Sequence, residues 1–377
     1  MSGQPKNTGF TPNLQAPTPG FSYWETKGWL RELDAVVVGG GLVGMSAALH
    51  LRERYPNWNI VVVDRKTLGS ATTRNAGFAC FGSPSELLED LNQLGTDEMA
   101  HLVGMRWEGL NALRNAWGDE AIGYRPCGAL EAFADGQLLD QCREALPALN
   151  EALLDVFGQV PFQEQKSGQD AGLTGLKGTI ASPLEGDLDA AKLATTMRRQ
   201  LQRCQIAFLA GHEVVNLSRH HGQWTLETLD GEICAHHVLV TTNGWASKLL
   251  DLDVETAPNT VIVSHPLKGL KLTQTIHHDR GYVYAREIDG RVLIGGGRHW
   301  SCSEKERIQR LQDWAAAHVV GASSFEVAHH WQGHLGVGAT RGPIVQSLGH
   351  GLHAGVRMGG MGVAIGTLVG RKLAGLV

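Results

Sequence analysis

The sequence has no paired cysteine motif and no long apolar run. Its six cysteines are scattered, without a C-x-x-C pair or the density of a small disulfide scaffold. No segment reaches the roughly 18 consecutive apolar residues of a membrane-spanning helix, and the N-terminal segment holds no apolar stretch of signal-peptide length. We therefore expect a cytoplasmic protein with reduced thiols and no integral membrane segment.

Clustered positive charge and metal-ligand spacing are also missing. The chain has 33 Lys and Arg and 38 Asp and Glu, which gives a net charge of -5. No run of basic residues is dense enough to indicate a nucleic-acid-binding surface. The 17 histidines include no H-E-x-x-H motif and no Cys/His ligand pattern. We expect neither nucleic acid as a partner nor a bound metal.

Glycine, in contrast, is abundant. The chain has 48 glycines in 377 residues, well above the roughly 7% of an average protein, and they follow no collagen-like period. Many tight turns, or close approaches of backbone to a ligand, are therefore expected. The length exceeds that at which single cores usually stop growing, so two domains are the default expectation.

The strongest local pattern begins after an N-terminal arm, residues 1–33. A β-branched run at 35–38 ("AVVV") leads into "GGGLVG" at 39–44, a helical stretch at 45–55 and a second buried strand at 59–64 ("NIVVVD"). These segments form a βαβ unit within about 30 residues, the frame in which a glycine-rich turn binds a dinucleotide.

Each glycine of this turn has a mechanical role. In G-x-G-x-x-G, Gly39 permits the tight turn, Gly41 lets backbone approach a pyrophosphate, and Gly44 allows close packing of helix on strand. The helix N-terminus offers free N–H groups to the phosphates. Asp64 ends the second strand, where a carboxylate can accept hydrogen bonds from ribose hydroxyls. The pattern predicts dinucleotide binding.

The remainder does not continue a simple βαβ alternation. Residues 85–154 are mostly helical in character, and a helix beginning near residue 188 has Asp187 or Asp189 as its N-cap. Residues 260–300 are rich in strands, with a hairpin turn at Asp289-Gly290. The chain ends in a strand, a glycine turn and an apolar helix.

The stretch "SATTRNAGFACFGS" at 70–83 follows the second strand and combines small and hydroxyl side chains with one arginine. Together with "AVVVGGGLVG", "VVVDR", "GDLDAAKL" at 186–193, "HVLVTTNGWAS" at 237–247 and "GMGVAIG" at 360–366, it resembles FAD-dependent oxidoreductases of the D-amino-acid oxidase type. That family includes glycine oxidase, sarcosine oxidase and γ-glutamylputrescine oxidase. The resemblance runs over nearly the whole chain from about residue 21.

The resemblance implies an α/β fold, α+β overall: a Rossmann-like FAD-binding domain with an interleaved substrate domain on a largely antiparallel sheet. It implies FAD-binding segments 34–85, 172–250 and 332–377, and substrate segments 86–171 and 251–331. The implied FAD contacts are Gly39, Gly41, Leu42, Val43, Gly44, Asp64, Arg65, Ser70, Thr72, Arg74, Asn75, Ala76, Gly77, Val214, Gly244, Trp245, Gly360, Met361, Gly362 and Val363.

On the substrate side the hairpin at 281–300 is implied to line the pocket above the flavin. Tyr282, Tyr284 and Arg286 share one strand face by period 2. Tyr282 aligns with a pocket tyrosine, and Arg298 falls where relatives place another substrate contact. Packing of both tyrosines in a sheet beside a solvated arginine is the competing interpretation.

The chain also departs from the family pattern in "WQGHLGVGATRGPIV" at 331–345. Leu335 stands where glycine-oxidase-like members place a carboxylate-binding arginine, and Thr340 replaces an aspartate, with the cation Arg341 beside it. Arg341 is therefore a further candidate for orienting the substrate. Gly333 replaces the cysteine that links flavin covalently in sarcosine oxidase relatives, so we expect non-covalent FAD, with Cys80 as a remote alternative.

The leading hypothesis is oxidation of an amine or amino acid. A hydride leaves the C–H next to nitrogen for flavin N5, water hydrolyses the imine, and oxygen or an electron carrier is the final acceptor. A hydroxy-acid dehydrogenase of the same superfamily is the first alternative. A flavin hydroxylase using NAD(P)H, a tRNA-modifying flavoenzyme and a non-catalytic flavin-binding protein are further alternatives.

Overall fold

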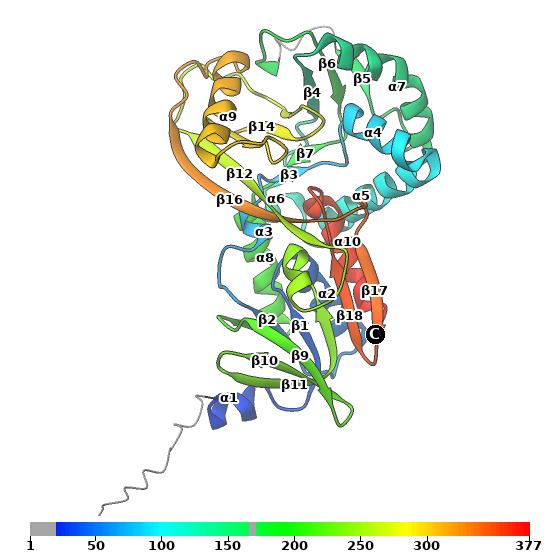
Figure 1. Cartoon of the computed structure of the whole chain (residues 1–377), viewed down its shortest axis with the longest axis vertical. Coiled ribbons are helices and arrows are strands. Elements are labelled where there is room, and N and C mark those ends of the chain that lie inside the picture. The colour runs from blue at the N-terminus through cyan, green and yellow to red at the C-terminus, as the bar shows by residue number, and fades with distance from the viewer. Residues whose placement is uncertain (1–19, 166–170) are drawn as a thin grey trace, which may run out of the picture.

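A computed structural model describes residues 20–165 and 171–377 of the protein. The expected extended arm therefore lies largely outside the described residues. Two eight-stranded sheets follow one another along the long axis of the molecule (Figure 1). A two-stranded sheet of β3 (Phe78–Ala79) and β7 (Gly186–Asp187) lies between them.

The first sheet has a parallel centre with antiparallel additions. The order β17-β18-β11-β1-β2-β8 is parallel from β18 to β8, while β17 and the β9–β10 ribbon pair antiparallel. Its strands are β1 (Leu33–Val38), β2 (Ile60–Asp64), β8 (Ala207–Ala210), β9 (Val214–His220), β10 (Gln223–Thr228), β11 (Gly231–Val240), β17 (Ile344–Gly349) and β18 (Leu352–Val356).

Helices cover this sheet because its central strands are apolar on both faces. β1 and β2 consist largely of buried β-branched residues, as a doubly covered parallel sheet requires. The helices associated with this half are α1 (Tyr23–Gly28), α2 (Leu42–Arg54), α3 (Ala71–Arg74), α8 (Ala190–Arg203), the 3₁₀-helix η2 (Asn243–Lys248) and α10 (Gly362–Ala374).

The second sheet is almost wholly antiparallel. Its order is β16-β12-β15-β14-β13-β4-β6-β5, and only β13 and β4 run parallel. Its strands are β4 (Ala129–Phe133), β5 (Gln163–Gln165), β6 (Gly178–Ser182), β12 (Glu255–Ser264), β13 (Thr275–His278), β14 (Val283–Ile288), β15 (Arg291–Gly296) and β16 (Val327–Val337). In this half lie α4 (Pro84–Leu94), α7 (Gly136–Phe157) and α9 (Glu304–His318), while α5 (Thr96–Trp117) packs on both α7 and α10, and α6 (Asp119–Ile122) packs on α8 of the first half.

This architecture confirms the predicted fold class. The division into FAD and substrate domains stays a prediction, and its boundaries do not coincide with sheet membership. β6 and the end of β16 pair within the second sheet, although the predicted FAD segments 172–250 and 332–377 include them. The reason is geometric: β16 runs the length of β12, so its pairing continues to Val337.

Several local predictions are confirmed. Asp189 is the N-cap of α8, where it accepts hydrogen bonds from the N–H groups of Ala191 and Lys192 at 2.8 and 2.9 Å. Asp289 and Gly290 both have positive φ, 50° and 70°, in the two-residue turn between β14 and β15.

The aromatic residues at the start of the described chain differ in burial. Phe21 packs against the core of the first sheet. Tyr23 and Trp24, however, are 67% and 75% exposed on α1. Both belong to the first turn of α1, a six-residue helix with no buried residue.

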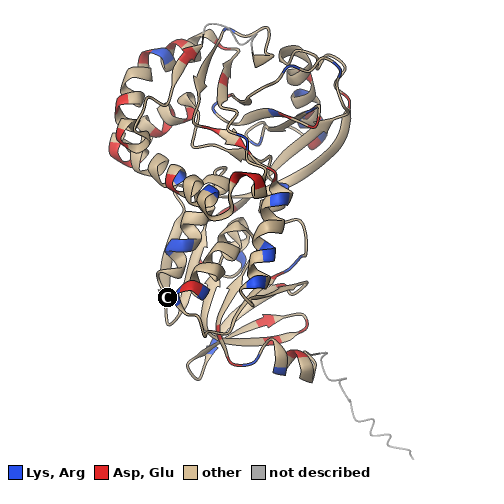
Figure 2. Cartoon of the chain, turned by 180° about the vertical axis from the view of Figure 1, so that it is seen from behind, with Lys and Arg blue, Asp and Glu red and all other residues tan. Residues whose placement is uncertain are grey.

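Charge is mixed over the surface. Figure 2 shows basic and acidic residues scattered over both lobes rather than gathered into one basic face. No helix among residues 20–165 and 171–377 is long and apolar enough to cross a membrane.

Candidate functional site

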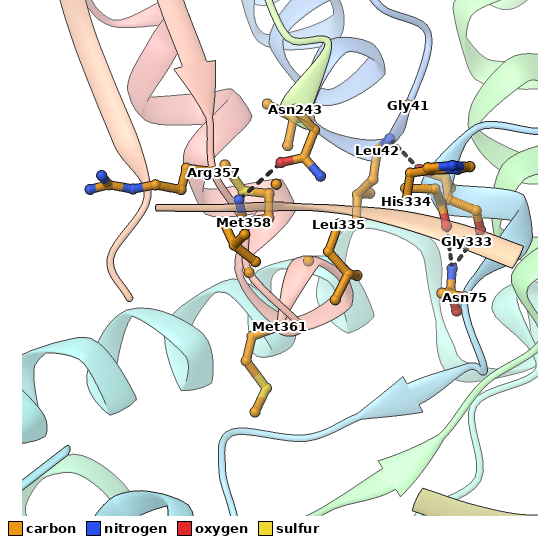
Figure 3. A pocket seen from close by; sticks show the side chains of 18 of the residues that line it. Gly41, Leu42, Asn75, Asn243, Gly333, His334, Leu335, Arg357, Met358 and Met361 are labelled. Carbon is orange, nitrogen blue, oxygen red and sulfur yellow. Dashed lines mark hydrogen bonds between the residues drawn. The ribbon is translucent and has the colours of Figure 1, made fainter. Parts of the chain in front are cut away.

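One cavity of about 640 Å³ connects the glycine turn of the first sheet with the second sheet. It receives residues from segments far apart in the chain, several of which Figure 3 shows around the same space. The predicted residues that line it are Gly39, Gly41, Leu42, Val43, Asp64, Arg65, Ser70, Thr72, Arg74, Asn75, Ala76, Val214, Trp245, Tyr282, Arg298, Arg341, Gly360, Met361, Gly362 and Val363.

Three predicted glycines do not line the cavity but support its walls. A Cβ at Gly44 would lie 1.9 Å from the carbonyl oxygen of Gly39. At Gly77, where φ is +77°, it would lie 2.3 Å from the carbonyl oxygen of Leu188, and at Gly244 2.5 Å from that of Leu335. These glycines allow main chain to pack on main chain, so their contribution to the site is indirect.

Asp64 braces the glycine turn. Its Oδ2 accepts a hydrogen bond from the N–H of Gly40 at 2.6 Å, and its Oδ1 accepts one from Lys66 at 2.9 Å. Nearby, the guanidinium of Arg65 lies over the ring of Trp245 at 4.3 Å. The end of β2 thus combines a carboxylate with a flat cationic and aromatic surface.

The stretch at 70–77 joins both halves of the site. The N–H of Leu42 donates to Thr72 Oγ1 at 2.8 Å, which ties the start of α2 to α3. The indole N–H of Trp331 donates to the carbonyl of Arg74 at 2.9 Å, and Arg74 Nη1 donates to the carbonyl of Gln332 at 3.2 Å. This stretch is therefore held between α2 and β16, with its small side chains facing the cavity.

The C-terminal turn lies opposite that stretch. Met361 is the N-cap residue of α10 and lines the cavity. Asn243, with a φ of 52°, accepts a hydrogen bond from the N–H of Met358 at 3.0 Å (Figure 3). The free N–H groups at the start of α10 consequently face the cavity, where they favour negative charge.

At the second-sheet end, tyrosine and arginine side chains form the walls. Tyr282 precedes β14, and the guanidinium of Arg298 lies over its ring at 4.4 Å. Tyr284 lies within β14, and its hydroxyl oxygen accepts a hydrogen bond from Asn259 Nδ2 at 2.9 Å. Arg286 is buried away from the cavity and pairs with Asp187 at 3.2 Å, which removes it as a solvated group.

Arg341 lines the cavity but is already engaged. Its Nη1 lies 2.8 Å from Asp90 and 3.7 Å from Glu86, and its Nη2 pairs with Glu89. Burial raises the pKa of Asp90 to about 6 against the opposing attraction of Arg341. The predicted role of Arg341 in orienting a substrate stays a prediction, and its three carboxylate partners count against an additional anionic one.

Sequence reasoning missed His277 and its partner. His277 lines the cavity from β13, and its Nε2 lies 2.7 Å from Oε2 of Glu185. The available signal was the alternation in "TIHH" at 275–278, which puts one histidine on each face of the strand without saying which face is the site. Glu185 is 92 residues away in the chain, so no local pattern joins the two.

Cys80, Glu185 and His277 are buried with their potential ligand atoms within 4.8 Å of one another. We assign the last two to hydrogen bonding, since Glu185 Oε1 already accepts from the N–H groups of Phe81 and Gly82 and its Oε2 pairs with His277. Cys80 Sγ lies 3.5 Å from Met361 Sδ. The predicted absence of a metal stays a prediction.

The fold and this cavity define a class of protein: a flavin oxidoreductase with a nucleotide-binding parallel sheet and an antiparallel sheet over the reactive end. The chain belongs to the DAO family, FAD dependent oxidoreductase, because the sequence model of that family matches residues 34–376. The predicted family, the enzyme class and FAD as cofactor are thereby confirmed.

Individual relatives are distant. The bifunctional protein ThiO/ThiG of Synechocystis sp. is 24% identical over 70% of this chain, which spans 38% of that protein's length. The γ-glutamylputrescine oxidoreductase of Escherichia coli is 22% identical, covering 91% of this chain and 83% of the relative. Glycine oxidase from Geobacillus kaustophilus has a TM-score of 0.75 at 19% identity, over 92% of this chain and 94% of that one, a likeness that shows the fold.

The residues present fit FAD. At Gly41 a Cβ would meet only Thr72 Oγ1, at 3.2 Å, so the backbone there is open to the cavity. The N-terminal ends of α2 and α10 both reach the same cavity through Leu42 and Gly362. An elongated ligand with an anionic middle and a ring that gains negative charge on reduction would meet the positive end of a helix dipole at both places.

Proposed function

We propose that the protein oxidises an amine or an amino acid with FAD, giving an imine that water then hydrolyses. The observation that carries the proposal is the continuous cavity, which joins the glycine turn to polar groups of the second sheet. Bound FAD supplies a two-electron acceptor for the hydride next to the substrate nitrogen. The names of two similar proteins, glycine oxidase and γ-glutamylputrescine oxidoreductase, support this substrate class.

The chain's own contribution is orientation and exclusion of water. Leu335, Val261 and Phe78 supply apolar wall, while Tyr284 is fixed by Asn259. Such a wall holds the substrate C–H bond in one orientation. This orientation accelerates the reaction without a covalent intermediate. We assign the pocket for the reacting carbon to this part of the cavity.

Arg298 is our candidate for a substrate carboxylate. Among the described residues it has no carboxylate within ion-pair distance and no hydrogen bond, although it lines the cavity. Stacking over Tyr282 fixes the guanidinium plane and leaves its N–H edge available for bidentate binding. This arrangement compensates for Leu335, which occupies the place of the arginine implied by the family resemblance.

The direct test is reduction of the bound flavin without oxygen. Amines, amino acids and hydroxy acids are added separately, and the flavin absorption band is followed. Bleaching by amines with release of ammonia or a smaller amine is expected, and readmitted oxygen or an added carrier then identifies the acceptor. Bleaching by hydroxy acids alone would establish the hydroxy-acid alternative, and bleaching by NADPH alone the hydroxylase.

Arg298→Gln tests how a carboxylate is held. We expect KM for carboxylate-bearing substrates to rise roughly 10- to 100-fold, the loss of a charge-assisted pair, with little change for amines that lack a carboxylate. Arg310→Gln is the matched control, because Arg310 also lies over a ring, that of Trp300 at 5.7 Å, but does not line the cavity. Equal effects of the two variants would contradict the assignment.

A further inference from the structure

A buried histidine and glutamate pair forms part of the cavity wall and has no place in the function described so far. His277 is 5% exposed and Glu185 1% exposed, and the two are joined at 2.7 Å. Glu185 is fixed in turn, because its Oε1 accepts the N–H groups of Phe81 and Gly82 at 3.0 and 3.3 Å. A carboxylate held this way fixes both the orientation and the tautomer of its histidine.

The two ring nitrogens of His277 are not equivalent. Nε2 is committed to Glu185. Nδ1 has no hydrogen-bond partner among the described residues and is not one of their fully enclosed polar atoms. When the ring is neutral and Nε2–H donates to Glu185, Nδ1 carries a lone pair. That nitrogen is the one available to a molecule in the cavity that His277 lines.

Charged and titratable groups surround His277 on several elements. His277 also lines a second void of about 10 Å³, together with Glu185, Glu131 and Ser83. His277 pairs in the sheet with Glu131 of β4 on one side and with Tyr284 of β14 on the other. The remaining facing groups are Glu86 on α4 and Cys80 after β3.

We propose that His277, held by Glu185, accepts a proton from the ammonium group of the substrate and so prepares the neutral amine that oxidation requires. The N–H bond of the ammonium breaks, the Nδ1–H bond of His277 forms, and the resulting imidazolium is neutralised by Glu185. No oxidant or reductant takes part in this step. The proposal rests on the proposed function, since only an amine substrate needs such a base.

The electrostatics of the pair agree with this role. Burial opposes a charged ring, but the attraction of Glu185, its hydrogen bond and the charges of Glu131 and Glu86 outweigh it, so the pKa of His277 is raised above its ordinary 6.5. A general base is most effective when its pKa lies near the working pH. The ring is neutral, and able to accept, above that pKa.

The sign of the pH dependence tests the proposal. For the wild-type enzyme kcat/KM should rise with pH through the pKa of His277. In Glu185→Gln, which removes the charge that raises this pKa, the rising limb should move about one pH unit or more to lower pH. Asp279→Asn is the matched control, because it alters another histidine–carboxylate pair, His299 with Asp279 at 2.8 Å, and should leave the limb in place.

Two further measurements separate a base from a structural residue. NMR titration of the His277 ring, assigned by its absence in His277→Gln, should show a pKa that falls in Glu185→Gln but not in Asp279→Asn. His277→Gln should lose about 100-fold in kcat/KM near neutral pH. That deficit should shrink as the pH approaches the pKa of the substrate's own amine, because the substrate then arrives neutral.

Each outcome has a distinct meaning. If amines reduce the flavin but Glu185→Gln does not move the rising limb of kcat/KM, His277 is not the base. The proposed function would then remain intact. A kcat/KM that falls as pH rises would show that His277 binds an anion instead, and would also overturn it. Wild-type flavin that no amine reduces would overturn the proposed function, and the base with it.

Discussion

The N–H of Leu42 donates to Thr72 Oγ1 across 30 residues of chain, in the buried wall of the cavity. This bond satisfies a free N–H at the start of α2 and fixes the position of α3 against the glycine turn. Because the helix start and the stretch at 70–77 are both predicted FAD contacts, their relative position decides whether the cofactor fits.

Thr72→Val should therefore weaken both stability and FAD binding. Valine has nearly the same shape but leaves the buried Leu42 N–H without a partner, at a cost of about 1 to 2 kcal/mol in the free energy of unfolding. Thr72→Ser keeps the hydroxyl and is the control. Urea denaturation of the apoprotein and titration with FAD measure the two effects. Equal behaviour of the valine and serine variants would show that this hydrogen bond is unimportant.

Gly44→Ala should abolish FAD binding because it distorts the backbone of the glycine turn, and not because the new methyl group touches FAD. Its Cβ would lie 1.9 Å from the carbonyl oxygen of Gly39, so the turn must shift. Gly41→Ala has room, with only Thr72 Oγ1 at 3.2 Å, and should stay folded while losing FAD affinity. Gly104→Ala, where the nearest atom is 3.9 Å away within α5, is the control.

Flavin content of the purified variants and FAD titration of their apo forms measure this series. We expect Gly41→Ala to have the circular dichroism spectrum of the wild type. An unchanged FAD affinity in Gly41→Ala would contradict a pyrophosphate at that turn.

Arg341→Gln should destabilise the fold in a pH-dependent way. Arg341 offsets the buried charge of Asp90, and removal of one partner of a buried pair costs roughly 3 kcal/mol. The pKa of Asp90 in the folded protein is already raised to about 6, above 3.8, so the folded state binds more protons than the unfolded state between these values. Stability therefore falls as pH rises through this range, and without Arg341 the fall continues above pH 6.

Urea midpoints at about pH 5.5 and pH 8 would show the difference. The deficit of Arg341→Gln should be larger at pH 8, where Asp90 carries its charge and keeps only Arg106, at 4.0 Å, as a cationic partner. Arg143→Gln is the control, because Arg143 makes exposed ion pairs with Asp140 and Glu164. A deficit independent of pH would contradict the role of Asp90.

Glu131→Gln should stabilise the protein at alkaline pH. Burial raises the pKa of Glu131 from 4.5 to about 7, although hydrogen bonds from Ser85 oppose the rise. A folded pKa above the unfolded one means that stability is lost as pH rises from 4.5 to about 7. The shift corresponds to at most about 3 kcal/mol at pH 8, which the amide should recover.

Thermal or urea unfolding at pH 5 and pH 8 measures the recovery. The wild type should lose stability between these pH values, and Glu131→Gln should lose less. Glu164→Gln, on the surface, should follow the wild type. A glutamine variant with the full pH dependence of the wild type would show that other groups cause it.

FAD should separate from the denatured chain. Cys80 is the remaining candidate for a covalent link, but burial strongly raises the pKa of its thiol, which leaves little of the reactive thiolate. After acid denaturation and filtration the flavin should appear in the filtrate, from the wild type and from Cys80→Ser alike. Flavin that stays with the wild-type polypeptide but not with Cys80→Ser would establish the link.

The sequence by itself determined the nucleotide half of the protein. The strand, "GGGLVG", helix and second strand ending in Asp64 form a contiguous unit, and its backbone requirements are local, so they can be read from residue types and spacing. The same holds for the turn before α10. Gly44, Gly77 and Gly244 were predicted as FAD contacts, but packing distances show that they support the cavity wall instead of lining it.

The substrate half was decided by tertiary structure. His277 and Glu185 meet because β13 and the segment before β7 converge, and Arg341 meets its carboxylates because the segment between β16 and β17 reaches α4. Such pairs depend on strand order and helix placement between distant segments, which no local spacing encodes. A free cation and a neutralised one look alike in the sequence, and only the fold distinguishes Arg298 from Arg341.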